Sequence, residues 1–220
     1  MDLFLSEFGK SFSPSDPAAM FMYVIALFGV FALTIGIERF YYILIRSNIN
    51  ADKFMAEIRK LVAGGNMDRA IALCDKGKQK ALPFVVLRGL KRAIESDTLD
   101  FRAIQNAVDE GTLEVIPRLQ ERTSYLSMFA NVATLTGLMG TFYGLILSFK
   151  AVSGEGIPEA EKTKVLAAGI SAAMNTTIFG LMIAIPTLIV YTYLTNRTTK
   201  IVDEMDEHLV KLINLITGNR

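Results

Sequence analysis

The chain has 220 residues, of which 51% are hydrophobic and 20% are charged, with a formal net charge of +1 and one cysteine. This composition excludes a disordered chain, a collagen and a disulfide-rich scaffold. The small net charge gives no global attraction to nucleic acid. The hydrophobic residues are collected in long charge-free runs, which excludes a simple water-soluble enzyme.

Three segments contain no Asp, Glu, Lys, Arg or His: residues 18–37, 123–149 and 165–196. Each reaches the roughly 20 residues that a helix needs to cross about 30 Å of hydrocarbon. The charged residues before the first segment are mainly acidic, whereas a signal peptide begins with a basic region. We therefore interpret residues 18–45 as a retained membrane anchor. The sequence therefore predicts an all-α membrane protein with three transmembrane helices.

Basic residues around these segments predict their orientation. Fourteen Lys and Arg lie in residues 46–122 and four in residues 197–220, against four in residues 1–17 and 150–164 together. Because cytoplasmic loops carry the excess of Lys and Arg, we expect the middle segment and the C-terminus in the cytoplasm. The N-terminus and the loop 150–164 are then expected on the opposite side, which would be the periplasm if the membrane is a bacterial inner membrane.

The second and third segments are longer than a bare crossing, since 32 residues of helix reach about 48 Å. Apolar residues at helical spacing precede the second and follow the third, so we expect both helices to extend far into the cytoplasm. Pro117 is expected to bend the second helix, and Gly218 to follow the end of the third. The extending positions are Phe101, Ile104, Val108, Val115 and Leu119, then Ile201, Met205, Leu209, Leu212 and Ile216.

The cytoplasmic segment 46–122 is predicted to be helical throughout. Gly64-Gly65 and Gly77 are expected to end its first two helices, a third follows Pro83, and Asp97 or Thr98 caps the next. It shows no nucleotide-binding glycine loop and no nucleophile beside a base, so we predict no enzyme activity.

Single residues outside the spans have plain interpretations. Cys74 is expected to be a small core residue, and His208 to pack in the tail helix rather than bind metal. Arg39, at the end of the first span, is expected to reach toward lipid headgroups.

The two long spans carry polar residues in helical register. Those of the second span lie on one face, and small residues that permit close helix approach lie among them. Such residues are also common where membrane helices merely pack, but six in register favour a surface lined by water or by a partner. The second span has Ser124, Ser127, Asn131, Thr134, Thr141 and Ser148 with Gly137, Gly140 and Gly144; the third has Ala173, Thr177, Gly180, Ala184 and Thr187, with Ser171, Asn175 and Thr176 beside them.

Hydroxyls and amides orient water or coordinate an ion, but they do not exchange protons near neutral pH. Since both long spans lack Asp, Glu, His, Lys and Arg, this chain alone has no ordinary proton relay. A second chain must bring the titrating group if protons are handled here.

Two segments resemble a known family. NVATLTGLMGTFYGLILSF at 131–149 and GISAAMNTTIFGLMIAIPTLIVY at 169–191 resemble the pore-lining segments of the ExbB/TolQ family, which is related to the flagellar stator subunit MotA. The core patterns are Gly137 to Gly144 and Thr177 to Pro186. With the order of spans and weaker likeness around Cys74 and Pro83, the resemblance covers nearly the whole chain.

The resemblance implies an inner-membrane motor subunit in which five copies surround a pore. The pore would hold the membrane helices of a smaller ExbD/TolR-like partner whose aspartate titrates, and ion flow down the proton motive force would drive rotation. A TonB-like or TolA-like energy transducer is a further implied partner, and the bilayer itself is a third. Thr141 and Thr177 match the family's pore threonines, and Pro186 its third-span proline.

The chain departs from the family at four positions. Ala172 stands where ExbB-type sequences usually have a glutamate, and Thr134 replaces a proline. Asn175 and Thr176 replace apolar or small residues. The added neutral oxygens are ligands of the kind that sodium prefers, so sodium is the alternative to protons as the driving ion; no bound cofactor or metal is expected.

Two other functions compete with the motor. A self-contained channel would conduct ions without a partner, and a passive membrane scaffold would use its polar residues only for packing. The predicted pore-lining residues are Thr141, Thr177, Thr176, Asn175, Asn131, Thr134 and Ser171; the predicted helix-packing residues are Gly137, Gly140, Gly144, Gly180 and Pro186.

Overall fold

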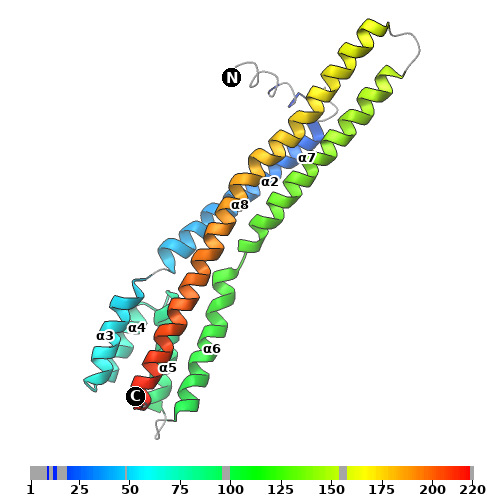
Figure 1. Cartoon of the computed structure of the whole chain (residues 1–220). Helices are drawn as coiled ribbons and strands as arrows, with labels where there is room; N and C mark the ends of the chain where they lie inside the picture. Colours follow the sequence, from blue (N-terminus) through cyan, green and yellow to red (C-terminus); the bar gives the residue numbers. More distant parts are fainter. Residues whose placement is uncertain are drawn as a thin grey trace. The chain divides into compact units, whose positions relative to one another are not determined.

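The computed structural model describes residues 9, 12–13, 19–47, 49–95, 100–153 and 158–218, without the side chains of 159 and 160. All regular structure in this part of the chain is helical, which confirms the predicted all-α class (Figure 1). In chain order the elements are α2 (Ala19–Tyr41), the π-helical turn η1 (Tyr42–Arg46), α3 (Ala51–Ala63), α4 (Met67–Lys76), α5 (Ala81–Glu95), α6 (Phe101–Gln120), α7 (Thr123–Val152) and α8 (Glu159–Thr217).

Three helical stretches are long and apolar enough to cross a membrane, and they begin in α2, near the start of α6 and in α8. Their most apolar windows are only 22%, 28% and 17% buried within the single chain. A water-soluble helix hides such residues in a core. The three transmembrane helices predicted from the sequence therefore find their counterparts in α2, α7 and α8, whose exposed apolar sides suit lipid or neighbouring chains.

The third predicted span and the predicted tail helix form one continuous element. Helix α8 has 59 residues, passes through Pro186 and ends at Thr217. Gly218, with φ of 70°, follows it as predicted, because glycine enters the left-handed region at little cost. The five apolar positions predicted on the tail, from Ile201 to Ile216, are all buried.

The second predicted span does not continue unbroken into the preceding helix, so that expectation is wrong in one respect. Pro117 lies inside α6, and the helix ends one turn later, where the N–H of Glu121 donates to the Pro117 carbonyl at 2.8 Å. Arg122 then adopts φ of 58° before α7 begins at Thr123. The helix is thus interrupted by a break at residues 121–122 and not bent at the proline.

The described chain forms two compact units. The first contains α2 up to Ile37, with α7 and the part of α8 up to Thr192. Its buried residues are mostly small side chains of α7 and α8 together with Met22 and Ile25 of α2. Gly29 of α2 meets α8: a β-carbon added there would lie 2.8 Å from the Ile183 side chain.

The second unit contains residues 38–121 and the end of α8 from Tyr193. In it α3 packs on α4, α4 on α5 and α5 on α6. The predicted ends at Gly64 and Gly77 are confirmed, whereas α5 begins at Ala81, so that Pro83 lies in its first turn. The predicted caps at 97 and 98 lie outside the described residues; the Asp100 carboxylate caps α6 by accepting the Arg102 N–H at 2.9 Å.

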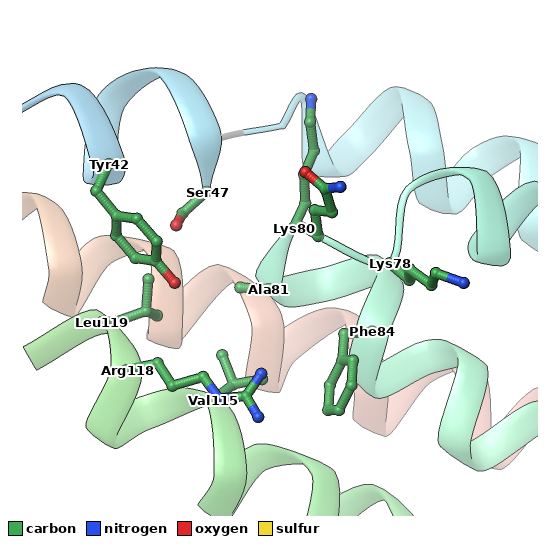
Figure 2. Close-up of a pocket in the computed structure, with 10 residues that line it drawn as sticks. Tyr42, Ser47, Lys78, Lys80, Ala81, Phe84, Val115, Arg118 and Leu119 are labelled. Atoms are coloured by element: carbon green, nitrogen blue, oxygen red, sulfur yellow. The ribbon is translucent and has the colours of Figure 1, made fainter.

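Arg39 is buried, which corrects its expected position among lipid headgroups. Its guanidinium donates to the carbonyl of Arg118 at 3.0 Å and to that of Leu119, and it lies 4.8 Å from the centre of the Tyr42 ring. A cation at the C-terminal end of α6 satisfies carbonyls that the helix leaves unpaired. A cavity of about 30 Å³ lies nearby between η1, α5 and α6, with Tyr42, Ala81 and Leu119 among its walls (Figure 2).

Candidate functional site

Helices α7 and α8 approach each other closely in the first unit because glycines face the opposite backbone. A β-carbon added at Gly137 would lie 2.8 Å from the Thr176 carbonyl oxygen, and one added at Gly180 would lie 2.7 Å from the Ala133 oxygen. Gly144 meets Ala173 in the same way, at 2.7 Å. Such contacts leave no room for a methyl group, so glycine at these positions is what sets the separation of the two helices.

Three threonine hydroxyls meet at this contact. Thr141 of α7 and Thr177 of α8 are in direct hydroxyl-to-hydroxyl contact, and the Thr176 hydroxyl lies 3.5 Å from that of Thr141. Thr176 is completely buried, whereas Thr141 and Thr177 are half-buried. We call Thr141, Thr176 and Thr177 the threonine cluster.

Backbone carbonyls of Gly137 and Ala173 receive the protons of the threonine cluster. The Thr177 hydroxyl donates to Gly137 at 3.1 Å, and the Thr176 hydroxyl reaches Ala173 at 2.8 Å and Gly137 at 3.0 Å. The Thr141 hydroxyl lies 3.2 Å from each of the same two carbonyls. Every hydroxyl can therefore donate within the protein.

The hydroxyl groups of the threonine cluster retain unused hydrogen-bond acceptors. A hydroxyl has one proton to donate and two lone pairs to accept with. With the protons committed to carbonyls or to each other, the half-buried Thr141 and Thr177 retain free lone pairs. The cluster is therefore an acceptor site, suited to a group that donates a proton or carries positive charge.

The other predicted pore-lining residues are not part of the cluster. Thr134 is half-buried, and its hydroxyl donates to Ala130 of its own helix at 3.0 Å. Asn131 and Ser171 are exposed, and Asn175 is half-buried. Pro186 is exposed too, unlike the predicted packing glycines Gly137, Gly140 and Gly180, which are buried.

Sequence reasoning missed parts of this contact. It placed Ala173 on the polar face of the third span, but not as the source of an acceptor carbonyl and of the surface that Gly144 meets, and it did not single out Ala133, which faces Gly180. Gly169 was not singled out, yet a β-carbon there would collide with the buried side chain of Ser148. Small residues repeating at three- and four-residue spacing were the available signal, but a carbonyl's role leaves no mark on the sequence.

No group of three or more His, Cys, Asp or Glu capable of holding a metal occurs among the residues that the structure describes. His208 is buried as expected, with its Nε2 3.4 Å from the Asp52 carboxylate. Cys74 is completely buried, and burial raises the pKa of its thiol to about 12.

Two charge-free helix segments that meet at a cluster of hydroxyls suit a membrane protein that handles ions. The comparisons specify this class. Residues 78–207 match the model of the MotA/TolQ/ExbB proton channel family. The chain therefore belongs to that family, and with three apolar helices it is a multi-pass protein of the inner membrane.

Individual relatives agree with this assignment. A putative biopolymer transport protein ExbB homolog of Methanothermobacter thermautotrophicus is 24% identical over 99% of this chain and 73% of its own length. The biopolymer transport protein ExbB of Aquifex aeolicus is 30% identical over 60% of this chain and 86% of its own. The C. jejuni MotAB structure has a similar fold, with a TM-score of 0.64 and 18% identity, covering 99% of this chain and 86% of that one.

Proposed function

We propose that the chain is a motor subunit that couples proton flow across the inner membrane to mechanical work. It acts with a single-span partner of the ExbD/TolR kind, whose membrane carboxylate lies against the threonine cluster. The observation that carries this proposal is the pair of half-buried hydroxyls, Thr141 and Thr177, in two helix segments (123–149 and 165–196) that contain no Asp, Glu, His, Lys or Arg.

The chemistry of the threonine cluster supports a mechanism in which this chain supplies hydrogen-bond acceptors and the partner supplies the carboxyl group that titrates. A protonated carboxyl group has one O–H to donate, and the free lone pairs of Thr141 and Thr177 accept it. A deprotonated carboxylate has no proton to donate and gains nothing from lone pairs. The cluster therefore favours the protonated partner, so that proton uptake and release change how strongly the partner is held.

Sodium is the alternative driving ion, and the burial of Thr176 weakens its case. A sodium site needs several oxygens that face one ion. The Thr176 hydroxyl has no exposed surface and is directed to Gly137 and Ala173. Only Thr141 and Thr177 of the threonine cluster then remain accessible, with Asn175 near them in sequence, and the proton remains the favoured ion.

We further propose that five copies surround the partner, with their N-termini periplasmic and C-termini cytoplasmic. Exposed apolar side chains cover α2, α7 and α8 in the single chain, and a ring of copies inside a bilayer would bury or solvate them. The driven process acts through a TonB-like or TolA-like transducer in this proposal.

The free energy released by one proton is too small to open a folded domain, so the proposed motor must work in repeated steps. A proton crossing about 100 mV releases about 2.3 kcal/mol, whereas opening a folded domain costs on the order of 5 to 15 kcal/mol. Several protons must therefore pass for each such event, which suits rotation better than a single stroke.

Substitution of Thr177 by valine tests the proposal. T177V keeps the shape of the side chain but removes the hydroxyl, so we expect proton flux through the complex with its single-span partner to fall about tenfold or more, because a lost hydrogen bond costs about 1 to 2 kcal/mol. The measurement is proton entry into proteoliposomes under an imposed membrane potential.

Thr187 provides the matched control. It is half-buried in the same helix, and its hydroxyl donates only to Ile183 one turn back. T187V should conduct like the wild type, and T177S should retain most of the flux. Undiminished flux in T177V, with normal assembly, would support the passive scaffold instead.

A further inference from the structure

An open cleft in the second unit is lined mainly by polar residues. It holds about 470 Å³ and lies where the start of α3 meets the loop before α5 and one side of α8. The volume falls within the range of small-ligand sites, about 300 to 1,000 Å³. The residues that line it are Ile49, Asn50, Ala51, Asp52, Lys80, Arg197, Lys200 and Glu204.

The charges of the cleft do not cancel. Lys200 and Glu204 pair with each other, with Nζ and Oε1 3.7 Å apart, and the Asp52 carboxylate lies 3.4 Å from His208. Lys80 and Arg197 have no carboxylate within 4 Å among the described residues. With Asp52, Lys80, Arg197, Lys200 and Glu204 counted, the cleft has a net charge of +1, and Lys80 and Arg197 are its cations outside any ion pair among the described residues.

Arg197 also has a hydrogen-bond donor without an acceptor. Its Nε is buried and has no hydrogen-bond partner among the described residues. A buried donor without an acceptor costs free energy, and a bound anion would supply the acceptor. The Lys80 side chain is free to contribute as well, since it extends away from Phe84 and Arg118 (Figure 2).

The position of the cleft along the chain indicates where such an anion comes from. Arg197 directly follows the charge-free run 165–196, and Ile49 follows the first apolar helix within a few residues. An exposed aromatic residue precedes the cleft residues in each of these two segments: Phe40 comes before Ile49, and Tyr193 comes before Arg197. The rings of Phe40 and Tyr193 stack, with 6.4 Å between their centres. Aromatic residues followed by basic ones are typical of the membrane–water interface.

We propose that this cleft binds the phosphate of an anionic phospholipid headgroup through Lys80 and Arg197. Arg197 forms hydrogen bonds to the phosphate oxygens in the geometry that guanidinium groups favour, and Lys80 adds a second positive charge. Residues 49–52, at the start of α3, complete the lining. A bound headgroup would fix the second unit to the bilayer surface, independently of how ions pass through the first.

Native mass spectrometry of the full-length chain in mild detergent tests this inference. With phosphatidylglycerol or phosphatidylcholine added, the wild type should retain phosphatidylglycerol in preference. In K80Q/R197Q the affinity for phosphatidylglycerol should fall about thirtyfold, from the loss of two cations near an anionic headgroup. The conservative variant K80R, which keeps both positive charges and the Arg197 guanidinium, should keep most of the preference, which distinguishes binding from a structural role.

K60Q/R69Q is the matched control, because it removes the same charge from exposed positions of α3 and α4 that do not line the cleft. Equal loss in the two glutamine variants would overturn the site, since general charge would then explain binding. Absence of any preference in the wild type would overturn it too. Glycerol phosphate, added without lipid, is the second arm: if it binds through Lys80 and Arg197 while phosphatidylglycerol does not, the lipid source is wrong.

Discussion

Cys74 shows how burial controls the chemistry of a single side chain. It has no exposed surface in α4, and the pKa of its thiol is raised from 9.0 to about 12 because burial disfavours the thiolate. The pKa is higher in the folded than in the unfolded chain. The resulting contribution to stability is therefore complete below about pH 9 and is lost as the pH rises toward 12.

We predict that the native thiol is almost unreactive at pH 8. A pKa higher by three units lowers the thiolate fraction about a thousandfold, and burial blocks access besides. Modification by Ellman's reagent should therefore be complete in denaturant and negligible in the folded chain. A72C in a C74S background, at an exposed position of the same helix, should react rapidly; equal rates for the two cysteines would contradict the prediction.

Neighbouring threonines show what residue-level reasoning from sequence can resolve. The sequence placed Thr176 and Thr177 together on one candidate surface. The structure buries the first completely and leaves the second half-buried. Helical periodicity gives the face of a residue only to within about one position, so two adjacent hydroxyls cannot be ranked without knowing where the opposite helix lies.

Arg39 illustrates the same limit for a charged residue. At the end of an apolar helix, lipid headgroups are the ordinary destination of an arginine. In the structure Arg39 instead donates hydrogen bonds to two carbonyls at the end of α6. These partners lie 79 and 80 residues away in sequence. No local pattern signals such a partner.

At the level of helices, the glycines of α7 and α8 determine the closest contact of the first unit. We predict that G137A loosens it, because the added methyl group would meet the Thr176 carbonyl at 2.8 Å and the Thr177 Cα at 3.2 Å. Both are backbone atoms, so a helix must shift rather than a side chain. The expected cost is about 1 to 3 kcal/mol, measured as a lower thermal unfolding temperature in detergent.

Gly36 supplies the control for this prediction. It lies in α2 of the same unit, and an added β-carbon would make only ordinary contacts, at 3.8 Å, with Leu126 and Val190. Alanine is the better helix former by about 1 kcal/mol, so G36A should leave the unfolding temperature unchanged or slightly higher. A fall as large as that of G137A would show that close approach at Gly137 is not the cause.

Helix ends were predictable where glycine marks them and unpredictable where it does not. Gly64, Gly77 and Gly218 follow the ends of α3, α4 and α8 as expected. The break between α6 and α7 falls at Glu121 and Arg122, neither of which is a typical helix breaker, with Arg122 in the left-handed region. Pro117 gave the only sequence signal, and it lies one turn too early.

At the scale of the whole chain, the two compact units differ in their chemical properties. The first contains the threonine cluster and long charge-free segments, and the second contains charged helices with the phosphate-binding cleft proposed above. In the proposed function the first unit serves ion passage, and the proposed lipid contact holds the second at the bilayer surface. The sequence predicted a cytoplasmic segment at 46–122 from the distribution of charge, and that placement stays a prediction.

The absence of Asp, Glu, His, Lys and Arg from the runs 123–149 and 165–196 leads to the final prediction. Hydroxyls accept and donate hydrogen bonds but do not exchange protons near neutral pH, so the chain without its partner should conduct no protons. We expect proteoliposomes that contain only this chain to match empty ones, and flux to appear when the single-span partner is co-reconstituted. A partner whose membrane aspartate is changed to asparagine should assemble but not conduct. Equal flux with and without the partner would establish the self-contained channel, because the proton would then cross on water alone.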